Sequence, residues 1–385
     1  MSKLKLVLLF SMVAVMAFAV CGYSQAQNTY KVGAIFSVTG PGSSLGTPEK
    51  NTIDMLVDEI NAAGGVNGKK LEVIFYDDAS DETNCRNKAS KLINDDKVAA
   101  IIGPTLSGTS LSILGITQNA EIPLVSCAAS VKIVEPVSDR KWVFKTPQSD
   151  FLVAERIVDY LKAQKITKVA IMTVKTGFGA SGKEQLEALL PPAGIDILIK
   201  EEFNEKDPDV LVQLTKVRAA DAQAIICWSL PPGGATLTRN MKKDLRMDIP
   251  LIMSHGVANM EYINLSADAA EGVVFPAGKL LIASLLPDSD PQKKILVKYA
   301  KDYEAKYGSV PSTFGGHAWD ALYLVVEAMK KAGSDPAKIR AELEKIKDFV
   351  GTGGVFNFSA TDHNGLVKDC LVMIKISNGK WTLMK

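Results

Sequence analysis

Residues 98–130 read VAAIIGPTLSGTSLSILGITQNAEIPLVSCAAS, and this stretch points to the fold class. Its two apolar runs, 98–103 and 122–126, are short and show no strict alternation of apolar and polar residues. Short continuous apolar runs are typical of strands that are buried on both faces. The segment between them has the length of one helix. A strand, a helix and a second strand in succession predict a parallel sheet covered by helices.

The same alternation continues on both sides of this stretch. Earlier in the chain we predict strands at 31–36 and 71–76, one helix from about Thr47 and another capped by Asp81. A second series of alternating strands and helices follows later in the chain. We predict strands at 169–173, 195–199 and 224–228 and helices that begin near Gly179 and Asp209. Two such series predict an α/β protein with two doubly wound parallel-sheet lobes.

Length and charge fit this organisation. A chain of 385 residues is long enough for two domains, and a hydrophobic share of 47% is enough to bury a full core. The 44 basic residues nearly balance the 43 acidic ones, whereas the surface of a nucleic-acid binder is markedly basic. We therefore expect no nucleic-acid partner.

Residues 1–26 have the pattern of a secretory signal peptide. Lys3 and Lys5 supply the positive start, an apolar run follows at 6–20, and the small residues before position 27 place cleavage after Ala26. Removal of this segment leaves 42 basic and 43 acidic residues, a net charge of −1. We predict export to the periplasm as a soluble protein.

Two alternatives for this segment stay open. A membrane anchor is one, although the apolar run is shorter than the roughly 20 residues that span a bilayer. Lipidation of Cys21 is the other, and it is disfavoured because Val20 is not the small residue that such a signal requires.

The residues that catalytic and metal sites need are scarce. The three histidines, His255, His317 and His363, are not at metal-ligand spacing, and no HExxH motif is present. The glycine-rich segment 40–47 lacks the lysine of a phosphate loop. We expect no enzyme activity, no metal and no cofactor.

The cysteine spacings match no zinc pattern either. Cys127 and Cys227 lie in apolar strand contexts, so we expect them to be buried free thiols, and we predict no disulfide pairing.

Small hydroxyl residues follow two neighbouring strands of the first series. Ser107 comes after the strand at 98–103, and Ser130 comes after the strand at 122–126. Ligands of doubly wound sheets bind outside the carboxyl ends of the strands, where helix N-termini offer free N–H groups to anions. The two serines thus predict a carboxylate site, and simple helix capping is the alternative.

Six motifs follow one another in order along the mature chain: GPGSSLG at 40–46, NAAGGVNGKKLEV at 61–73, YDDASD at 76–81, LINDDKVAAIIGP at 92–104, IPLVSCAAS at 122–130 and AEGVVF at 270–275. With these motifs the chain resembles the solute-binding proteins of branched-chain amino-acid ABC importers, the leucine/isoleucine/valine-binding type. The resemblance implies a type I periplasmic binding protein, whose two lobes are joined by three hinge crossings and close over one small ligand.

The resemblance also implies where the lobes divide. The crossings fall near Lys145–Thr146, Pro276–Ala277 and Val355–Phe356. The first lobe then comprises 29–145 and 277–355, and the second comprises 146–276 and 356–385.

Carried over by position, the carboxylate-binding serine of the family falls on Ser107, with partners at Ala128 and Ser130. First-lobe Leu45 stands where an aromatic residue often flanks the ligand. Phe178 stands where an aromatic residue of the second lobe closes the pocket. Trp228, at the end of a second-lobe strand, would add a further wall. Core packing is the alternative role for both second-lobe aromatics.

His255 departs from the family pattern. Amino-acid binders of this type carry an acidic residue at this position, which pairs with the ammonium group of the ligand. A neutral or protonated imidazole does not compensate a buried positive charge. The substitution favours a carboxylate with an apolar or aromatic body over an α-amino acid, unless His255 is only a structural loop residue.

The function that follows from the resemblance is capture of a small carboxylate by a monomer and its delivery to ABC transporter permease subunits. A ligand sensor built on the same two-lobed fold is the alternative.

Overall fold

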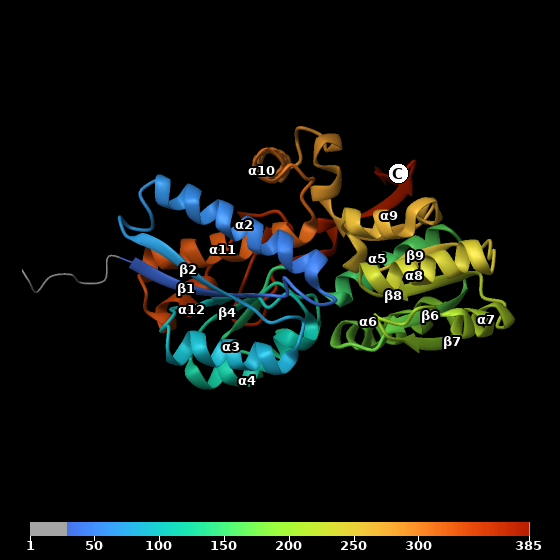
Figure 1. Ribbon diagram of the computed structural model, residues 1–385, viewed down its shortest axis with the longest axis horizontal. Coiled ribbons are helices and arrows are strands. Elements are labelled where there is room, and N and C mark those ends of the chain that lie inside the picture. Colours follow the sequence, from blue (N-terminus) through green and yellow to red (C-terminus); the bar gives the residue numbers. More distant parts are fainter. Residues whose placement is uncertain (1–28, 385) are drawn as a thin grey trace, which may run out of the picture.

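The computed structural model describes residues 29–384, which form two α/β lobes lying side by side (Figure 1). Each lobe is built around its own sheet. The predictions of a signal peptide and of Cys21 as a lipidation site lie outside the described residues.

The first sheet has five strands, all parallel, in the order β2-β1-β3-β4-β5. Its strands are β1 (Thr29–Phe36), β2 (Lys70–Asp77), β3 (Ile101–Ile102), β4 (Leu124–Ser126) and β5 (Val143–Lys145). The helices between them are α2 (Ser43–Ala62), α3 (Glu82–Asn94) and α4 (Ser107–Ala120). Strands β3, β4 and β5 are wholly buried, as expected for a parallel sheet with helices on both faces.

The second sheet has seven strands in the order β14-β13-β10-β9-β8-β6-β7. The parallel part consists of β6 (Lys168–Val174), β7 (Asp196–Phe203), β8 (Ala224–Trp228), β9 (Leu251–Met253) and β10 (Val274–Gly278). Two antiparallel strands, β13 (Leu371–Ser377) and β14 (Lys380–Leu383), complete one edge. The helices around this sheet are α5 (Asp150–Ala163), α6 (Gly177–Leu189), α7 (Leu211–Ala219), α8 (Pro231–Arg239) and α9 (Met260–Ser266).

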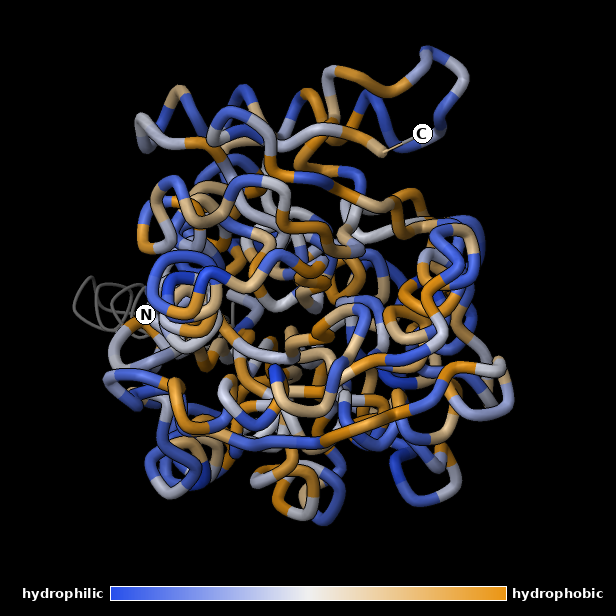
Figure 2. Tube along the Cα trace, turned by 90° about the vertical axis from the view of Figure 1, so that its right-hand side faces the viewer, coloured by the Kyte–Doolittle hydropathy of each residue, from blue (hydrophilic) through white to orange (hydrophobic). Residues whose placement is uncertain are grey.

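Three later helices return to the first lobe (Figure 1). They are α10 (Lys293–Tyr307), α11 (Thr313–Ala332) and α12 (Pro336–Leu343). Helix α11 packs along α2, and its buried residues fill the space between α2 and the sheet. Hydrophilic and hydrophobic residues alternate along the peripheral helices, as amphipathic packing requires (Figure 2).

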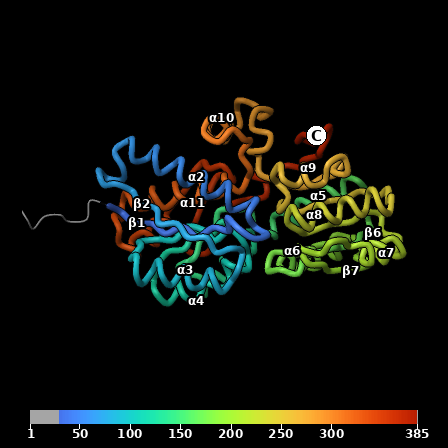
Figure 3. Tube along the Cα trace, viewed as in Figure 1, coloured from blue at the N-terminus to red at the C-terminus, as the bar shows by residue number. Residues whose placement is uncertain are grey.

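The chain passes between the lobes three times, which Figure 3 shows as the change from blue and teal to green and yellow, back to orange, and finally to red. The first passage follows β5, which ends at Lys145. Pro276 and Ala277 lie inside β10, and the chain leaves the second sheet only after Gly278. Val355 and Phe356 form β12, which pairs with β11 (Phe349–Val350), and the final passage leads from there to β13.

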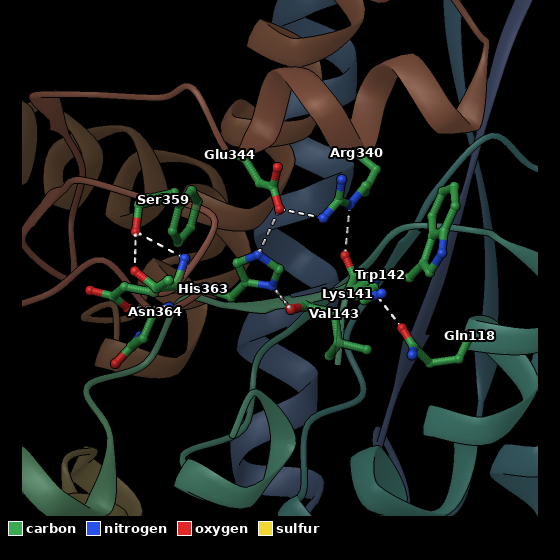
Figure 4. Close-up of polar contacts among 12 residues, drawn as sticks. Gln118, Lys141, Trp142, Val143, Arg340, Glu344, Ser359, His363 and Asn364 are labelled. Atoms are coloured by element: carbon green, nitrogen blue, oxygen red, sulfur yellow. Dashed lines mark hydrogen bonds and ion pairs between the residues drawn. The ribbon is translucent and has the colours of Figure 1, made fainter. Parts of the chain in front are cut away.

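A buried histidine joins the first and the last passage (Figure 4). The Nδ1 atom of His363 is 2.8 Å from the carbonyl oxygen of Val143, and its Nε2 atom is 3.2 Å from a carboxylate oxygen of Glu344. Its ring stacks on Phe144 with the centroids 4.1 Å apart. Arg340 binds the same carboxylate and donates to the carbonyl oxygen of Lys141 at 2.8 Å. These contacts fix the third passage against β5.

Most local predictions are confirmed. Asp81 caps α3 by accepting the amide N–H of Asn84 at 2.8 Å, and the strand predicted at 224–228 is β8. The helix predicted from about Thr47 is confirmed as α2, but it begins earlier, at Ser43. The amides of Leu45 and Gly46 already donate to the carbonyl oxygen of Gly42, at 2.9 and 3.0 Å.

The strand predicted at 98–103 is also shorter than expected. Strand β3 comprises only Ile101 and Ile102, although Ala99 and Gly103 also donate to the neighbouring strands, and Gly103 turns the chain with a φ of 87°. Alanine at this position would place a Cβ 2.1 Å from the carbonyl oxygen of Ile35, so the turn requires glycine.

Cys85, Cys127, Cys227 and Cys370 are all buried free thiols, which confirms the prediction for Cys127 and Cys227. Among residues 29–384, no helix combines the length and the apolar character needed to cross a membrane.

Candidate functional site

A cavity lies where loops of the two lobes meet. Its internal volume for a water-sized sphere is about 30 Å³, far below the roughly 300–1,000 Å³ that is usual for small-molecule sites, so its own wall nearly fills the cavity in this closed arrangement. Both lobes, the first passage and α11 contribute to its wall, which consists of Leu45, Thr105, Leu106, Ser107, Cys127, Ala128, Ala129, Pro147, Phe178, Leu230, His255, Gly256, Phe314 and His317.

Five of the residues predicted from the sequence are brought together in this wall: Leu45, Ser107, Ala128, Phe178 and His255. Ser130 and Trp228 are not part of the wall, although both lie directly behind it. Their predicted contact with a ligand therefore has no support in this geometry.

The N-terminus of α4 reaches the cavity through Leu106 and Ser107. Leu106 is the N-cap residue, and no side chain caps the helix. The first amide N–H groups of a helix have no partner inside it, and the helix dipole makes them attractive to an anion. The Ser107 hydroxyl is not a cap, since it instead accepts the amide N–H of Ser130 at 3.3 Å. The capping alternative is thus wrong for Ser107.

Ser130 is bound to protein groups rather than to the cavity. Its side chain is fully buried, accepts the amide N–H of Lys132 at 3.3 Å and donates to the hydroxyl of Ser181 at 2.8 Å. Ser181 belongs to α6 of the second lobe, so this contact joins the lobes. The amide N–H of Ala128 is also occupied, because it donates to the Ser126 hydroxyl at 3.1 Å.

Three rings form a cluster on the second-lobe side. The ring centroids of Phe178 and Trp228 are 5.8 Å apart, those of Phe178 and His255 are 5.6 Å apart, and those of Trp228 and His255 are 6.0 Å apart. Trp228 is fully buried and lies against Gly182 of α6, where a Cβ would come within 2.2 Å of the indole. Trp228 therefore supports the two rings that line the cavity.

A second histidine, which the sequence did not reveal as a site residue, joins His255 in the wall. His317 lies in the first half of α11, and both side chains are almost wholly buried. Burial lowers the pKa of His255 to about 3, and the charge of Lys145 acts in the same direction. Burial also lowers the pKa of His317 to about 3, with further contributions from His255 and Lys145. Both imidazoles are thus neutral at any physiological pH.

Each of these rings has an unused nitrogen. The Nδ1 atoms of His255 and His317 are buried and make no hydrogen bond with any residue that the structure describes. A neutral imidazole offers one N–H donor and one lone-pair acceptor. Leaving such groups buried and unpaired costs free energy, so the two rings favour a polar ligand group beside them.

No Asp or Glu is present in the wall of the cavity as the structure describes it. Glu49 stands behind Thr105, whose hydroxyl donates to its carboxyl group. Burial raises the pKa of Glu49 well above its usual value, against the opposing effect of Thr105. Burial therefore favours the neutral form of this carboxyl group.

Two further carboxyl groups lie behind the wall: that of Asp150, whose two oxygens are buried without a hydrogen-bond partner among the described residues, and that of Glu205. Burial raises the pKa of Asp150 to about 6, and the charge of the buried Lys145 opposes this shift. Burial likewise lowers the pKa of Lys145 to about 7, opposed by Asp150, so the pair contributes no net charge. Glu205 accepts two amide N–H groups at the start of α8, those of Leu230 at 2.9 Å and Gly233 at 3.0 Å.

Residues 29–384 contain no group of three or more His, Cys, Asp and Glu side chains placed to hold a metal ion.

Residues 29–380, nearly all of the described part of the chain, match the family of periplasmic binding proteins. The chain belongs to this family. Its relatives include the leucine-, isoleucine-, valine-, threonine- and alanine-binding protein of Pseudomonas aeruginosa, 26% identical over 370 residues that cover 94% of this chain and 92% of the relative. The Leu/Ile/Val-binding protein BraC3 of Rhizobium johnstonii is 26% identical over 91% of this chain and 92% of its own length.

Solved structures of periplasmic binding proteins share the fold. An extracellular ligand-binding receptor from Rhodopseudomonas palustris HaA2 is 29% identical, with a TM-score of 0.87, and covers 94% of this chain and 100% of the receptor. The branched-chain amino acid binding protein LivJ of Streptococcus pneumoniae, solved with isoleucine, is 26% identical with a TM-score of 0.81, covering 92% and 97% of the two chains. The chain is thus a type I binding protein of an extracytoplasmic, non-enzymatic family.

Proposed function

We propose that this protein captures a small apolar carboxylate outside the cytoplasm and delivers it to the permease of an ABC importer of the branched-chain amino-acid type. The observation that carries the proposal is the cavity between the lobes. One end of it meets the uncapped N-terminus of α4, and the remainder is lined mainly by apolar and aromatic side chains.

In this proposal two lobes close over the ligand. The first lobe comprises residues 29–145 and 277–355, and the second comprises residues 146–276 and 356–385. The first lobe holds the carboxylate with Ser107 and the α4 amides. The second lobe contributes Phe178 and His255, which cover the apolar body. Binding releases water from the apolar wall and provides partners for buried donors, and both effects stabilise the closed form.

Several contacts that join the lobes support a ligand-controlled closure. Ser130 donates to Ser181, Lys132 pairs with Glu184, and the side chain of Asn259 donates to the carbonyl oxygen of Ser44 at 3.3 Å. These contacts exist only while the lobes are closed. A permease can then distinguish the closed from the open surface.

The remaining parts of the proposal concern the cellular setting. We propose that the mature protein acts as a monomer in the periplasm, after export through its signal peptide, and that permease and ATPase subunits are its partners.

Isothermal titration calorimetry tests capture directly. We expect at least one hydrophobic carboxylate, among branched and aromatic amino acids and their deaminated analogues, to bind with a dissociation constant in the micromolar range or below. Uptake of that compound should fall when the gene is deleted and return with the intact gene. Absence of binding across the whole panel would refute the proposed function, and binding without any uptake defect would favour a sensor.

A further inference from the structure

We propose that the cargo is a hydrophobic carboxylate that lacks an ammonium group and carries a hydroxyl or keto oxygen, and that His255 and His317 bind this oxygen. This inference rests on the proposed function and specifies its ligand class. It makes His317 a specificity-determining residue.

The charges around the cavity exclude a buried ammonium group. An α-amino acid would bring a positive charge beside its carboxylate, and a buried charge without a partner is strongly unfavourable. No Asp or Glu lines the described cavity. The carboxyl groups of Glu49, Asp150 and Glu205 stand behind the wall and do not line the cavity; burial favours the neutral form of Glu49, and Glu205 is bound to the start of α8.

The two imidazoles do not replace the negative charge that the cavity wall lacks. The lone pair of a neutral imidazole can accept an ammonium N–H, but the ring supplies no negative charge to compensate the ammonium. Lys145, the nearest cation behind the wall, also disfavours a further positive charge. A zwitterion would therefore bind with its carboxylate satisfied at α4 and its ammonium group without a counter-charge in the wall.

A neutral oxygen matches what the histidines offer. The buried Nδ1 atoms of His255 and His317 lack partners among the described residues. A hydroxyl group can accept from one ring and donate to the other, and a keto oxygen can accept from both. Either group would satisfy buried polar atoms that a purely apolar ligand would leave unpaired.

Titration of matched ligands tests the inference. The first set is leucine, 2-hydroxy-4-methylpentanoate and 4-methyl-2-oxopentanoate, and the second is phenylalanine, 3-phenyllactate, phenylpyruvate and 3-phenylpropionate. Within each set the apolar body is constant. We expect the better of the hydroxy and oxo acids to bind at least about tenfold more tightly than the amino acid, and more tightly than the unsubstituted acid.

Substitutions at His317 and His255 test whether these two residues cause the preference for hydroxy and oxo acids. His317→Phe keeps a ring of similar size but removes the hydrogen-bonding atoms, so it should reduce the advantage of the oxygen-bearing acid over 3-phenylpropionate about tenfold. His255→Glu supplies a carboxylate and should shift the preference toward the amino acid. His317→Gln, which retains a donor and an acceptor, is the matched control and should preserve part of the preference.

The outcomes separate this inference from the proposed function. Tight binding of leucine or phenylalanine, with weaker binding of the hydroxy and oxo acids, would overturn the inference and leave capture of carboxylates intact. Absence of binding by every compound would overturn both. The wild-type titrations decide the inference even where a histidine variant fails to fold, since they need no substitution.

Discussion

Ser107 combines a position at the cavity with a hydroxyl that does not cap its helix. The hydroxyl accepts the amide of Ser130, and the free amides of α4 begin at the same residue. A carboxylate bound there would gain a hydrogen bond to a charged group, which contributes about 1.5–3 kcal/mol.

Ser107→Ala should therefore weaken ligand binding by roughly tenfold to a hundredfold. The melting temperature of the free protein should fall less than the affinity does, because no helix cap is lost and the one protein contact removed is the 3.3 Å hydrogen bond from the Ser130 amide. Calorimetry and thermal unfolding check this. Ser112→Ala is the control, since Ser112 lies on the same helix and bonds only to backbone carbonyl groups, at 2.7 and 3.3 Å. A loss of stability equal to the loss of affinity would show that Ser107 is structural.

The two buried histidines link stability to pH. Their pKa values are about 3 in the folded protein, below the ordinary value of 6.5 expected in the unfolded chain. Between these values the unfolded chain binds protons that the folded chain does not, so the free energy of unfolding decreases as pH falls below 6.5. Asp320 acts in the opposite direction, because burial raises its pKa from 3.8 to about 7.

His317→Phe should remove one of these contributions. Between pH 6 and 4, the free energy of unfolding of the wild type should decrease relative to that of the variant by about 1.4 kcal/mol per pH unit. Urea denaturation at several pH values checks this. The contribution of Asp320 is the same in the wild type and the variant, so it cancels in the difference between them. Parallel curves would show that His317 titrates normally.

Helix α2 contains a proline whose effect extends to the other lobe. Pro48 has no amide N–H, so the carbonyl oxygen of Ser44, four residues earlier, has no intrahelical donor. Asn259 donates to that oxygen at 3.3 Å through its Nδ2 atom. Its Oδ1 atom meanwhile accepts the amide N–H of Tyr262 at 3.2 Å and caps α9. One amide side chain thus caps one helix and binds another.

Asn259→Asp separates these two functions. Aspartate keeps the cap but replaces the donor with an oxygen that faces the Ser44 carbonyl group. We expect the ligand affinity to fall about fivefold or more, with little change in the melting temperature of the free protein. Asp81→Asn, the reverse exchange at the cap of α3, is the control and should leave affinity unchanged. An unaltered affinity of Asn259→Asp would exclude this contact from closure.

At the scale of the whole molecule, closure brings the starts of α4 and α6 together. A Cβ added at Gly177 would lie 3.1 Å from the amide nitrogen of Gly108 and 3.2 Å from its Cα. Each glycine belongs to a different lobe. A larger side chain at Gly177 therefore obstructs approach of the lobes without touching the core of either.

Gly177→Val should weaken ligand binding by more than about tenfold and suppress closure, because overpacked contacts cost roughly 1–3 kcal/mol. Small-angle scattering should show that ligand reduces the radius of gyration of the wild type but not of the variant. Gly115→Val on α4 is the control, since its Cβ would meet no atom within 4 Å. Normal closure of Gly177→Val would contradict a tight contact between α4 and α6.

Much of this architecture is predictable from the chain. The parallel strands, the buried cysteines and the position of Ser107 at the start of a helix follow from local patterns of apolar and polar residues. His317 and Phe314 do not, because within α11 they read as ordinary members of an apolar helix. Only the packing of α11 brings them to the cavity, more than 200 residues after Ser107.

The sequence by itself determined two α/β lobes, since apolar periodicity is a local property that strands and helices must satisfy. Its resemblance to the amino-acid binders also predicts that their acidic partner of the ammonium group is replaced here by His255. The tertiary structure alone decided that Ser130 and Trp228 stand behind the wall, that His317 joins His255, and that the nearby carboxyl groups do not line the cavity. These features depend on which side chains meet across the lobes. The charge and hydrogen bonding of these side chains are set by their burial rather than by residue type.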